Sequence, residues 1–139
     1  MPLYICNTKQ GVLDQSQKAS IAQAITDIHC AVTGAPPSFV HAVFFEEAPQ
    51  FPQDGKEDSK DIFVRGTIRA GRSDDQKNDI SERIQKALVS HTGLEPSGAA
   101  ALIRETPASW VLEGGEIMPE PGEEAEWFAA QEARRASES

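Results

Sequence analysis

The feature that most constrains the fold is an internal repeat, in which two halves of the chain match at an offset of 59 residues. The identities are few, but they fall where secondary structure is expected to begin or end. The matched pairs are Thr8 with Thr67, Gln17-Lys18 with Gln76-Lys77, Ile21 with Ile80, Thr33-Gly34 with Thr92-Gly93, and Glu46 with Glu105. We therefore expect two copies of one small unit, about residues 2–47 and 61–106, within a single domain spanning 1–139.

Each half has the pattern strand, helix, strand. Asp14 and Ser73 are predicted to cap the two helices, because each is followed three positions later by Gln in a variant of the capping box. Isoleucines at helical spacing follow each cap, and a Thr-Gly pair ends each helix, at Gly34 and Gly93. The predicted strands cover residues 3–8, 39–45, 62–68 and 99–103.

These elements predict an α+β fold. A strand–helix–strand crossover of this length joins parallel strands and is almost always right-handed. Two such β-α-β units side by side give a four-stranded, mainly parallel sheet with both helices on one face. The other face is then bare, and a bare apolar face predicts association with further copies of the chain.

The acidic composition argues against two classes of partner. The formal net charge is −9, and residues 119–139 form an acidic tail punctuated by Pro and Gly, which Trp127-Phe128 could anchor in part. Nucleic acids and anionic membranes are bound through basic patches, so neither is an expected partner. The apolar runs are too short to span a membrane, and the start of the chain does not have the pattern of a signal peptide.

Three further segments bear on location and cofactors. Residues 47–61, rich in charge and containing two Pro and a Gly, are predicted to be an exposed connector. Cys6 and Cys30 could form a bridge, but free thiols in a reducing, cytoplasmic setting are the simpler interpretation. The cysteines and histidines do not have metal-ligand spacing, and no phosphate-binding loop is seen, so neither a metal nor a cofactor is expected.

Pro2 follows the initiator methionine at the head of an apolar, strand-like run. If Met1 is removed, the chain begins with a secondary amine, a group that no side chain supplies. An α-amino group titrates near pH ~7.7–8, so modest burial or nearby positive charge can bring it close to neutrality. A base poised there can move protons at carbon. Because about one protein in twenty would carry proline at position two by chance, the rest of the chain has to support this hypothesis.

Arg69 and Arg72 flank Ala70-Gly71 directly before the predicted Ser73 cap. A helix N-terminus favours negative charge, and a guanidinium can hold a carboxylate through two hydrogen bonds. The pair therefore predicts an anion site, with two solvated loop arginines as the alternative.

Two other residues have the chemistry for proton transfer. His29 lies about 80° from the centre of the apolar stripe of the first helix, at the border of its buried and exposed faces, and is either a functional imidazole or a partly exposed helix residue. Glu113, which precedes Gly114-Gly115, is either a carboxylate presented to a pocket as a base toward water or a solvated loop residue. His41, inside a predicted strand, is interpreted as structural.

Taken together, Pro2, the doubled β-α-β unit and the arginine pair resemble the tautomerase superfamily, whose enzymes use an amino-terminal proline. Within it, the chain is similar to the cis-3-chloroacrylic acid dehalogenase-like family, from Pro2 to about Phe128. The likeness rests on the order and spacing of several stretches. They are Ala24-Ile25-Thr26-Asp27-Ile28-His29, Ile68-Arg69-Ala70-Gly71-Arg72-Ser73, Met118-Pro119-Glu120-Pro121-Gly122 and Glu126-Trp127-Phe128.

The resemblance implies a role for each candidate residue. Pro2 would be the catalytic amine, and Arg69 and Arg72 would hold the carboxylate of the substrate. His29 would help to bind or polarise the substrate, and Glu113 would position or deprotonate water. The resemblance also implies a homotrimer, which agrees with the bare sheet face.

The implied function is that of a cofactor-free enzyme acting on a small unsaturated or 2-oxo carboxylic acid. A neutral Pro2 would move a proton between an enol oxygen and carbon, as a tautomerase or isomerase does. A cationic Pro2 would protonate carbon while His29 and Glu113 activate water, as a hydratase or a dehalogenase of cis-3-haloacrylate-like acids does. Leu102 stands where the dehalogenases place a tyrosine that assists water activation, which favours the first chemistry. A binding or scaffold trimer with weak catalysis is a further alternative.

Overall fold

The computed structural model describes residues 1–47 and 61–138, and these contain both predicted units. The first unit consists of β1 (Leu3–Lys9), α1 (Gln15–Thr33) and β2 (His41–Glu47), and the second of β3 (Ile62–Arg69), α2 (Asp74–Thr92) and β4 (Ala99–Thr106). After β4 come a short hairpin, β5 (Leu112–Glu113) and β6 (Glu116–Ile117), and a third helix, α3 (Glu124–Glu138). Single helical turns η1 (Pro37–Phe39), η2 (Pro96–Gly98) and η3 (Ala108–Trp110) precede β2, β4 and β5.

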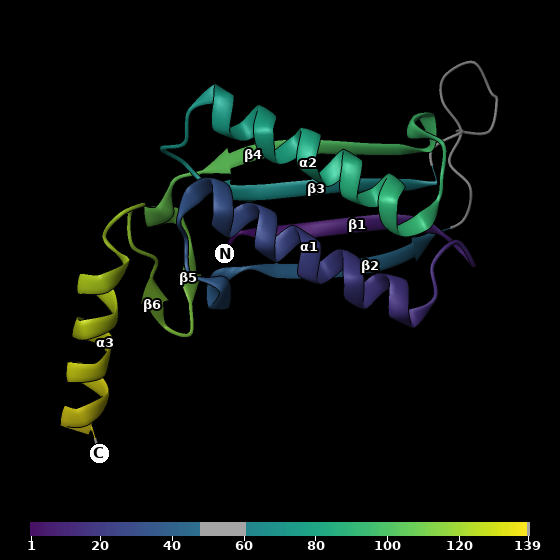
Figure 1. The fold of residues 1–139 in the computed structure, drawn as a ribbon. Coiled ribbons are helices and arrows are strands. Elements are labelled where there is room, and N and C mark those ends of the chain that lie inside the picture. The colour runs from purple at the N-terminus through teal and green to yellow at the C-terminus, as the bar shows by residue number, and fades with distance from the viewer. Residues whose placement is uncertain (48–60, 139) are drawn as a thin grey trace.

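The four long strands form one sheet in the order β2-β1-β3-β4. Within each unit the two strands are parallel, whereas the central pair β1 and β3 is antiparallel. Helices α1 and α2 lie side by side over one face of this sheet (Figure 1). The predicted fold class is therefore confirmed, and the two β-α-β units lie side by side in antiparallel orientation.

The local signals for the two helices act as predicted. The side chain of Asp14 accepts a hydrogen bond from the backbone N–H of Gln17, and the Gln17 side chain accepts from the backbone N–H of Asp14. Ser73 and Gln76 form the same reciprocal pair at the start of α2. The glycine after each helix has a positive φ, which a residue with a Cβ rarely adopts, so each helix ends there.

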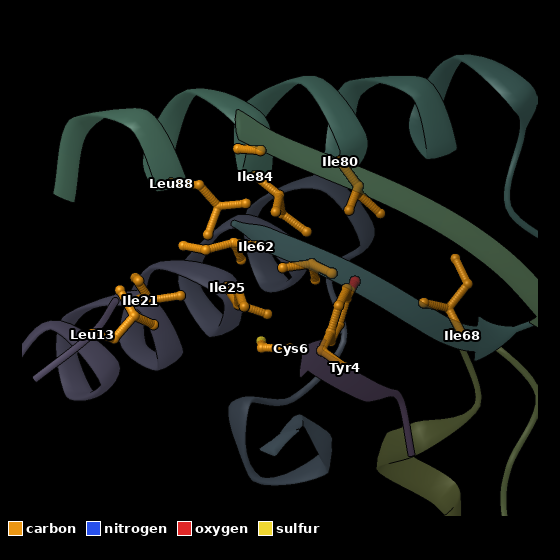
Figure 2. Packing of buried hydrophobic residues seen from close by; sticks show 12 residues of the cluster. Tyr4, Cys6, Leu13, Ile21, Ile25, Ile62, Ile68, Ile80, Ile84 and Leu88 are labelled. Atoms are coloured by element: carbon orange, nitrogen blue, oxygen red, sulfur yellow. The ribbon is translucent and has the colours of Figure 1, made fainter. Parts of the chain in front are cut away.

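The core lies between the sheet and the two helices (Figure 2). Alternate residues of β1 and β3 are buried, so one face of the sheet meets the helices and the other does not. Each fully buried Ile or Leu contributes roughly 1.5–3 kcal/mol relative to an exposed one. The buried cluster consists of Tyr4, Cys6, Leu13, Ile21, Ile25, Ile62, Val64, Ile68, Ile80, Ile84, Leu88 and Ala99.

The second face of the sheet is open and partly apolar. Val43, Phe45 and Leu102 are 39%, 50% and 45% exposed, respectively, although all three are large hydrophobic residues. The bare face predicted from the repeat is therefore present in the single chain.

Three sequence predictions differ from the structure. The second strand starts at His41 rather than at residue 39, because the turn after Pro36-Pro37 takes up Phe39, and the fourth strand continues to Thr106. The acidic tail contains α3, which projects from one end of the sheet (Figure 1). The connector predicted over 47–61 lies, apart from its two ends, outside the described residues.

Two other expectations concern the cysteines and the membrane. Cys6 is buried, Cys30 is half-buried, and both are free thiols. Within residues 1–47 and 61–138, no helix has the length and apolar character that a bilayer crossing requires.

Candidate active site

The predicted site residues meet at one end of the sheet because of the strand directions. Since β1 runs opposite to β3, the beginning of β1 lies beside the end of β3, with Leu3 opposite Thr67. The beginning of β2 lies at the same end, because β2 is parallel to β1. The end of α1 and the beginning of α2 also meet here, where Arg72 Nη1 donates to the carbonyl of Thr33 at 3.1 Å. The start of the chain and its basic residues are thereby brought together.

The chain begins against Glu113. The terminal amine of Met1 donates to Glu113 Oε2 at 2.7 Å, and His41 Nε2 lies 2.9 Å from Glu113 Oε1. The hydrogen bond from the amine lowers the pKa of Glu113; burial acts in the opposite direction, and His41 assists the lowering. Pro2 is buried, and its carbonyl accepts from the backbone N–H of His41 at 3.0 Å. The interpretation of His41 as a structural residue is therefore incomplete, because its side chain joins β2 to the carboxylate that faces the amine.

His29 is fully buried, so its predicted place at the border of the helix is wrong. Ile21, Ile25 and His29 recur every four residues, and this row of α1 faces the sheet. His29 Nδ1 lies 2.8 Å from the hydroxyl of Tyr4 on β1. Burial lowers the pKa of His29 to about 4, and the positive charges of Arg72, Arg69 and the amino terminus act in the same direction. The imidazole is therefore neutral at pH 7.

Arg69 is buried and holds the acidic tail. Its Nη1 donates to the carbonyl of Pro119 at 2.6 Å, and its Nη2 donates to Glu124 Oε1 at 2.8 Å. The guanidinium also lies 5.3 Å from the centre of the Phe39 ring. Burial raises the pKa of Glu124, but the hydrogen bond from Arg69 and further hydrogen bonds outweigh it, so the pKa is lowered. Arg69 is thus not a solvated loop residue, and the carboxylate that it binds here belongs to the same chain.

Among the described residues, Arg72 has fewer of its N–H groups in hydrogen bonds than Arg69 has. Nη1 donates to Thr33, while Nε is buried and has no hydrogen-bond partner in the described part of the chain. Burial lowers the pKa of Arg72, the charge of Arg69 adds to this, and Glu124 opposes it. An unpartnered buried N–H costs about 1–3 kcal/mol, so an added acceptor is favoured beside Arg72.

The tail forms a hollow next to Glu113. The rings of Phe39, Trp127 and Phe128 pack together with centroids 5.2–5.6 Å apart, and Trp127 Nε1 donates to the carbonyl of Ile117. The hollow has a volume of about 230 Å³. It is lined by Ser38, Phe39, Glu113, Gly114, Met118, Trp127, Phe128, Gln131 and Arg135. Glu113 therefore links the amino terminus to an aromatic-walled pocket.

Comparison with known proteins decides the family. The family model described as "Putative oxalocrotonate tautomerase enzyme" matches residues 1–133. The crystal structure of N1, a member of the cis-3-chloroacrylic acid dehalogenase family, is 30% identical and superposes with a TM-score of 0.84 over 92% of this chain and 91% of that chain. This chain belongs to the tautomerase superfamily, in the cis-3-chloroacrylic acid dehalogenase-like family.

Two further solved structures share the tautomerase fold. Native Ps01740 is 36% identical, with a TM-score of 0.73 over 81% of this chain and 100% of that chain. Native fused 4-OT has a TM-score of 0.73 over 84% of this chain and 95% of that chain, and at 19% identity it supports the fold alone. No curated protein matches the sequence.

The Arg69–Glu124 pair is expected to anchor α3 in this protein. Glu124→Gln leaves a buried guanidinium without its counter-charge and should lower the free energy of unfolding by about 2 kcal/mol. The change is measured by urea unfolding at one fixed protein concentration, with Trp127 fluorescence reporting whether α3 stays packed. Glu126→Gln, in the same turn but exposed, is the matched control. Equal stability of the two variants would show that the pair does not anchor the tail.

The low pKa of His29 predicts that the protein loses stability in mild acid. The unfolded chain takes up a proton near pH ~6.5, and the folded chain only near pH 4, so the unfolded state binds more protons between these values. Stability should therefore fall by about 3 kcal/mol as the pH drops from 6.5 to 4. Urea unfolding across this range measures the slope, which His29→Gln should reduce. Parallel slopes in the two proteins would contradict the assignment.

Proposed function

We propose that this chain is a cofactor-free tautomerase or isomerase that acts on a small unsaturated or 2-oxo carboxylic acid through the amine of Pro2. Removal of Met1 would convert the Pro2 nitrogen from an amide, which cannot act as a base, into a secondary amine. The observation that carries the proposal is the contact between the start of the chain and Glu113 at 2.7 Å. Arg72 and His29 belong to the same cluster, because the charges of Arg72 and of the amino terminus both lower the pKa of His29.

In the proposed reaction the amine takes the proton of the enol hydroxyl. The oxygen electron pair forms the carbonyl, and the electron pair of the carbon–carbon double bond accepts the same proton from the Pro2 ammonium. No atom is gained or lost, so no co-reactant is needed. The positive charge of Arg72 favours the neutral amine that starts this cycle, whereas Glu113 favours the ammonium that completes it.

Arg72 is the proposed first contact for the carboxylate of the substrate. Its Nε is unpartnered among the described residues, whereas both terminal nitrogens of Arg69 are bound to Pro119 and Glu124. Arg69 contributes its charge from this position, and a substrate would reach its nitrogens only by displacing the carboxylate of Glu124. The two arginines of the predicted clamp therefore have unequal roles.

Hydration or hydrolytic dehalogenation of cis-3-haloacrylate-like acids is the second candidate. The position of Glu113, which accepts from the Met1 amine, favours it, because after removal of Met1 this carboxylate would stabilise the Pro2 ammonium that the chemistry requires. Water would add its oxygen to carbon 3 while the Pro2 ammonium protonates carbon 2, and the halohydrin would then lose halide and a proton to give an aldehyde. Leu102 lies half-exposed on the open sheet face and cannot assist this step as a tyrosine would.

We also propose that the chain forms a homotrimer in the cytoplasm. The apolar side chains on the open face support association, because burial of such a surface is favourable. One fold relative is described as the F6 fused 4-OT wild-type asymmetric trimer, which is 19% identical to this chain. Sedimentation of the purified protein measures its mass directly.

The intact mass of the mature chain and the variant Pro2→Ala test the role of the amine. The mass should correspond to loss of Met1, and Pro2→Ala should lower kcat by at least about 100-fold without changing the oligomer. Enol ketonisation and halide release are assayed in parallel, with Pro96→Ala at the opposite end of the sheet as the control. Unchanged turnover in Pro2→Ala would refute the proline mechanism. Absence of both activities in the wild type, with the trimer intact, would favour a scaffold.

Arg72→Gln tests the carboxylate contact. Loss of the guanidinium should raise KM for a carboxylate substrate about tenfold or more, with a smaller change in kcat, because the contact is made in the ground state. Arg83→Gln is the control, since Arg83 pairs with Asp79 on the exposed side of α2, the helix that follows Arg72. A KM equal to that of the wild type would place the carboxylate elsewhere.

A further inference from the structure

Tyr4 and His29 form a closed pair inside the core. Tyr4 is 0% exposed and His29 2% exposed, although both carry polar atoms. The hydroxyl lies 2.8 Å from Nδ1, and the rings meet edge to face with centroids 5.7 Å apart and planes at 75°. Figure 2 shows Tyr4 standing among the apolar residues between β1 and the helices. A polar pair in such surroundings has few alternative geometries.

The proton in this hydrogen bond can be assigned from the partners present. The Tyr4 hydroxyl has no hydrogen-bond partner other than His29 Nδ1 in the described part of the chain. If Nδ1 carried the proton, the hydroxyl hydrogen would be buried without an acceptor, which is unfavourable because a buried donor loses its hydrogen bond to water without replacement. The hydroxyl therefore donates, Nδ1 accepts, and the imidazole proton sits on Nε2. Burial favours the neutral forms of both groups, since it raises the pKa of Tyr4 and lowers that of His29.

Strand β3, which lies beside β1 in the centre of the sheet, leaves space for the Tyr4 ring. Gly66 on β3 lies directly opposite Tyr4. A Cβ at position 66 would come within 2.4 Å of Tyr4 Cε1 and 2.9 Å of Ile103 Cδ1, so only glycine fits. The Tyr4 ring therefore packs against Gly66, and its hydroxyl lies beside His29 of α1.

We propose that Tyr4 is a positioning residue that fixes His29 as a hydrogen-bond donor through Nε2, and so assigns His29 to polarising the substrate rather than to activating water. A neutral imidazole whose Nδ1 accepts from Tyr4 and whose Nε2 carries hydrogen has no free lone pair with which to take a proton from water. The charges that lower the pKa of His29 are the positive ones of Arg72, Arg69 and the amino terminus, which attract an anionic or carbonyl oxygen to this donor. In the hydration or dehalogenation reaction, Glu113 is then left as the acceptor of protons from water.

This inference rests on the proposed function for its catalytic meaning, but the tautomer can be tested without any activity. Two-bond proton–nitrogen correlation spectra of the ¹⁵N-labelled full chain at pH 7 report which imidazole nitrogen of His29 carries hydrogen. We expect the Nε2–H form in the wild type and a mixture of both tautomers in Tyr4→Phe, which keeps the ring but not the hydroxyl. The Nδ1–H form or an imidazolium in the wild type, or an unchanged tautomer in Tyr4→Phe, would overturn the inference. Cys6→Ala controls for lost packing and should leave the tautomer unchanged, because Cys6 is the next residue of β1 on the same buried face as Tyr4.

Kinetics provide the second arm. Tyr4→Phe should lower kcat about tenfold with little change in KM, and the same substitution should have no further effect in a His29→Gln background. An equal fall in both backgrounds would mean that Tyr4 does not act through His29. If the proline mechanism fails instead, Pro2→Ala keeps full turnover while the spectra still show the Nε2–H form, so the two failures are distinguishable.

Discussion

The antiparallel pairing of β1 with β3 is the contact on which the rest of the structure depends. It joins the two β-α-β units, and its register, with Leu3 opposite Thr67, sets the beginning of the chain beside the end of β3. A parallel pairing at this position would carry Arg69 to the far end of the sheet from the amino terminus. Within this central pair Tyr4 is buried against Gly66, and the Tyr4 hydroxyl lies within hydrogen-bonding distance of His29. Fold and candidate site therefore share one set of backbone hydrogen bonds.

The repeat makes two equivalent ends of the sheet, but among the described residues the candidate site residues lie at one of them. At an offset of 59 residues, Asp61 takes the place of Pro2 and Leu88 that of His29. The arginine pair corresponds to Gln10 and Leu13, of which Leu13 is part of the core. Leu88 and Leu13 extend the apolar core at the second end. At the first end, buried charged and hydrogen-bonded side chains replace such apolar contacts. Such an exchange costs stability and is typical of functional sites.

Most of the fold could be predicted because its signals are local. Capping boxes, terminal glycines and the periodicity of isoleucines act within a few residues and predict both helices. Short runs of β-forming residues are equally local and predict the four long strands. The helix α3 was missed because its packing depends on contacts with distant residues, among them Phe39 on Trp127 and Arg69 on Glu124. The burial of His29 was misjudged for a similar reason, since the partner that stabilises it there, Tyr4, comes from another element.

The sequence by itself determined the β-α-β repeat, the family and the residues able to carry proton transfer, because these are set by residue type and spacing. Only the tertiary structure decided how those residues are used. It paired Arg69 with Glu124, left Arg72 Nε without a hydrogen-bond partner in the part of the chain that the structure describes, and brought Glu113 to the start of the chain. Charge and hydrogen-bond partners depend on distances of a few ångströms between segments far apart in the chain. Such distances are fixed only when the sheet, the helices and the tail have packed together.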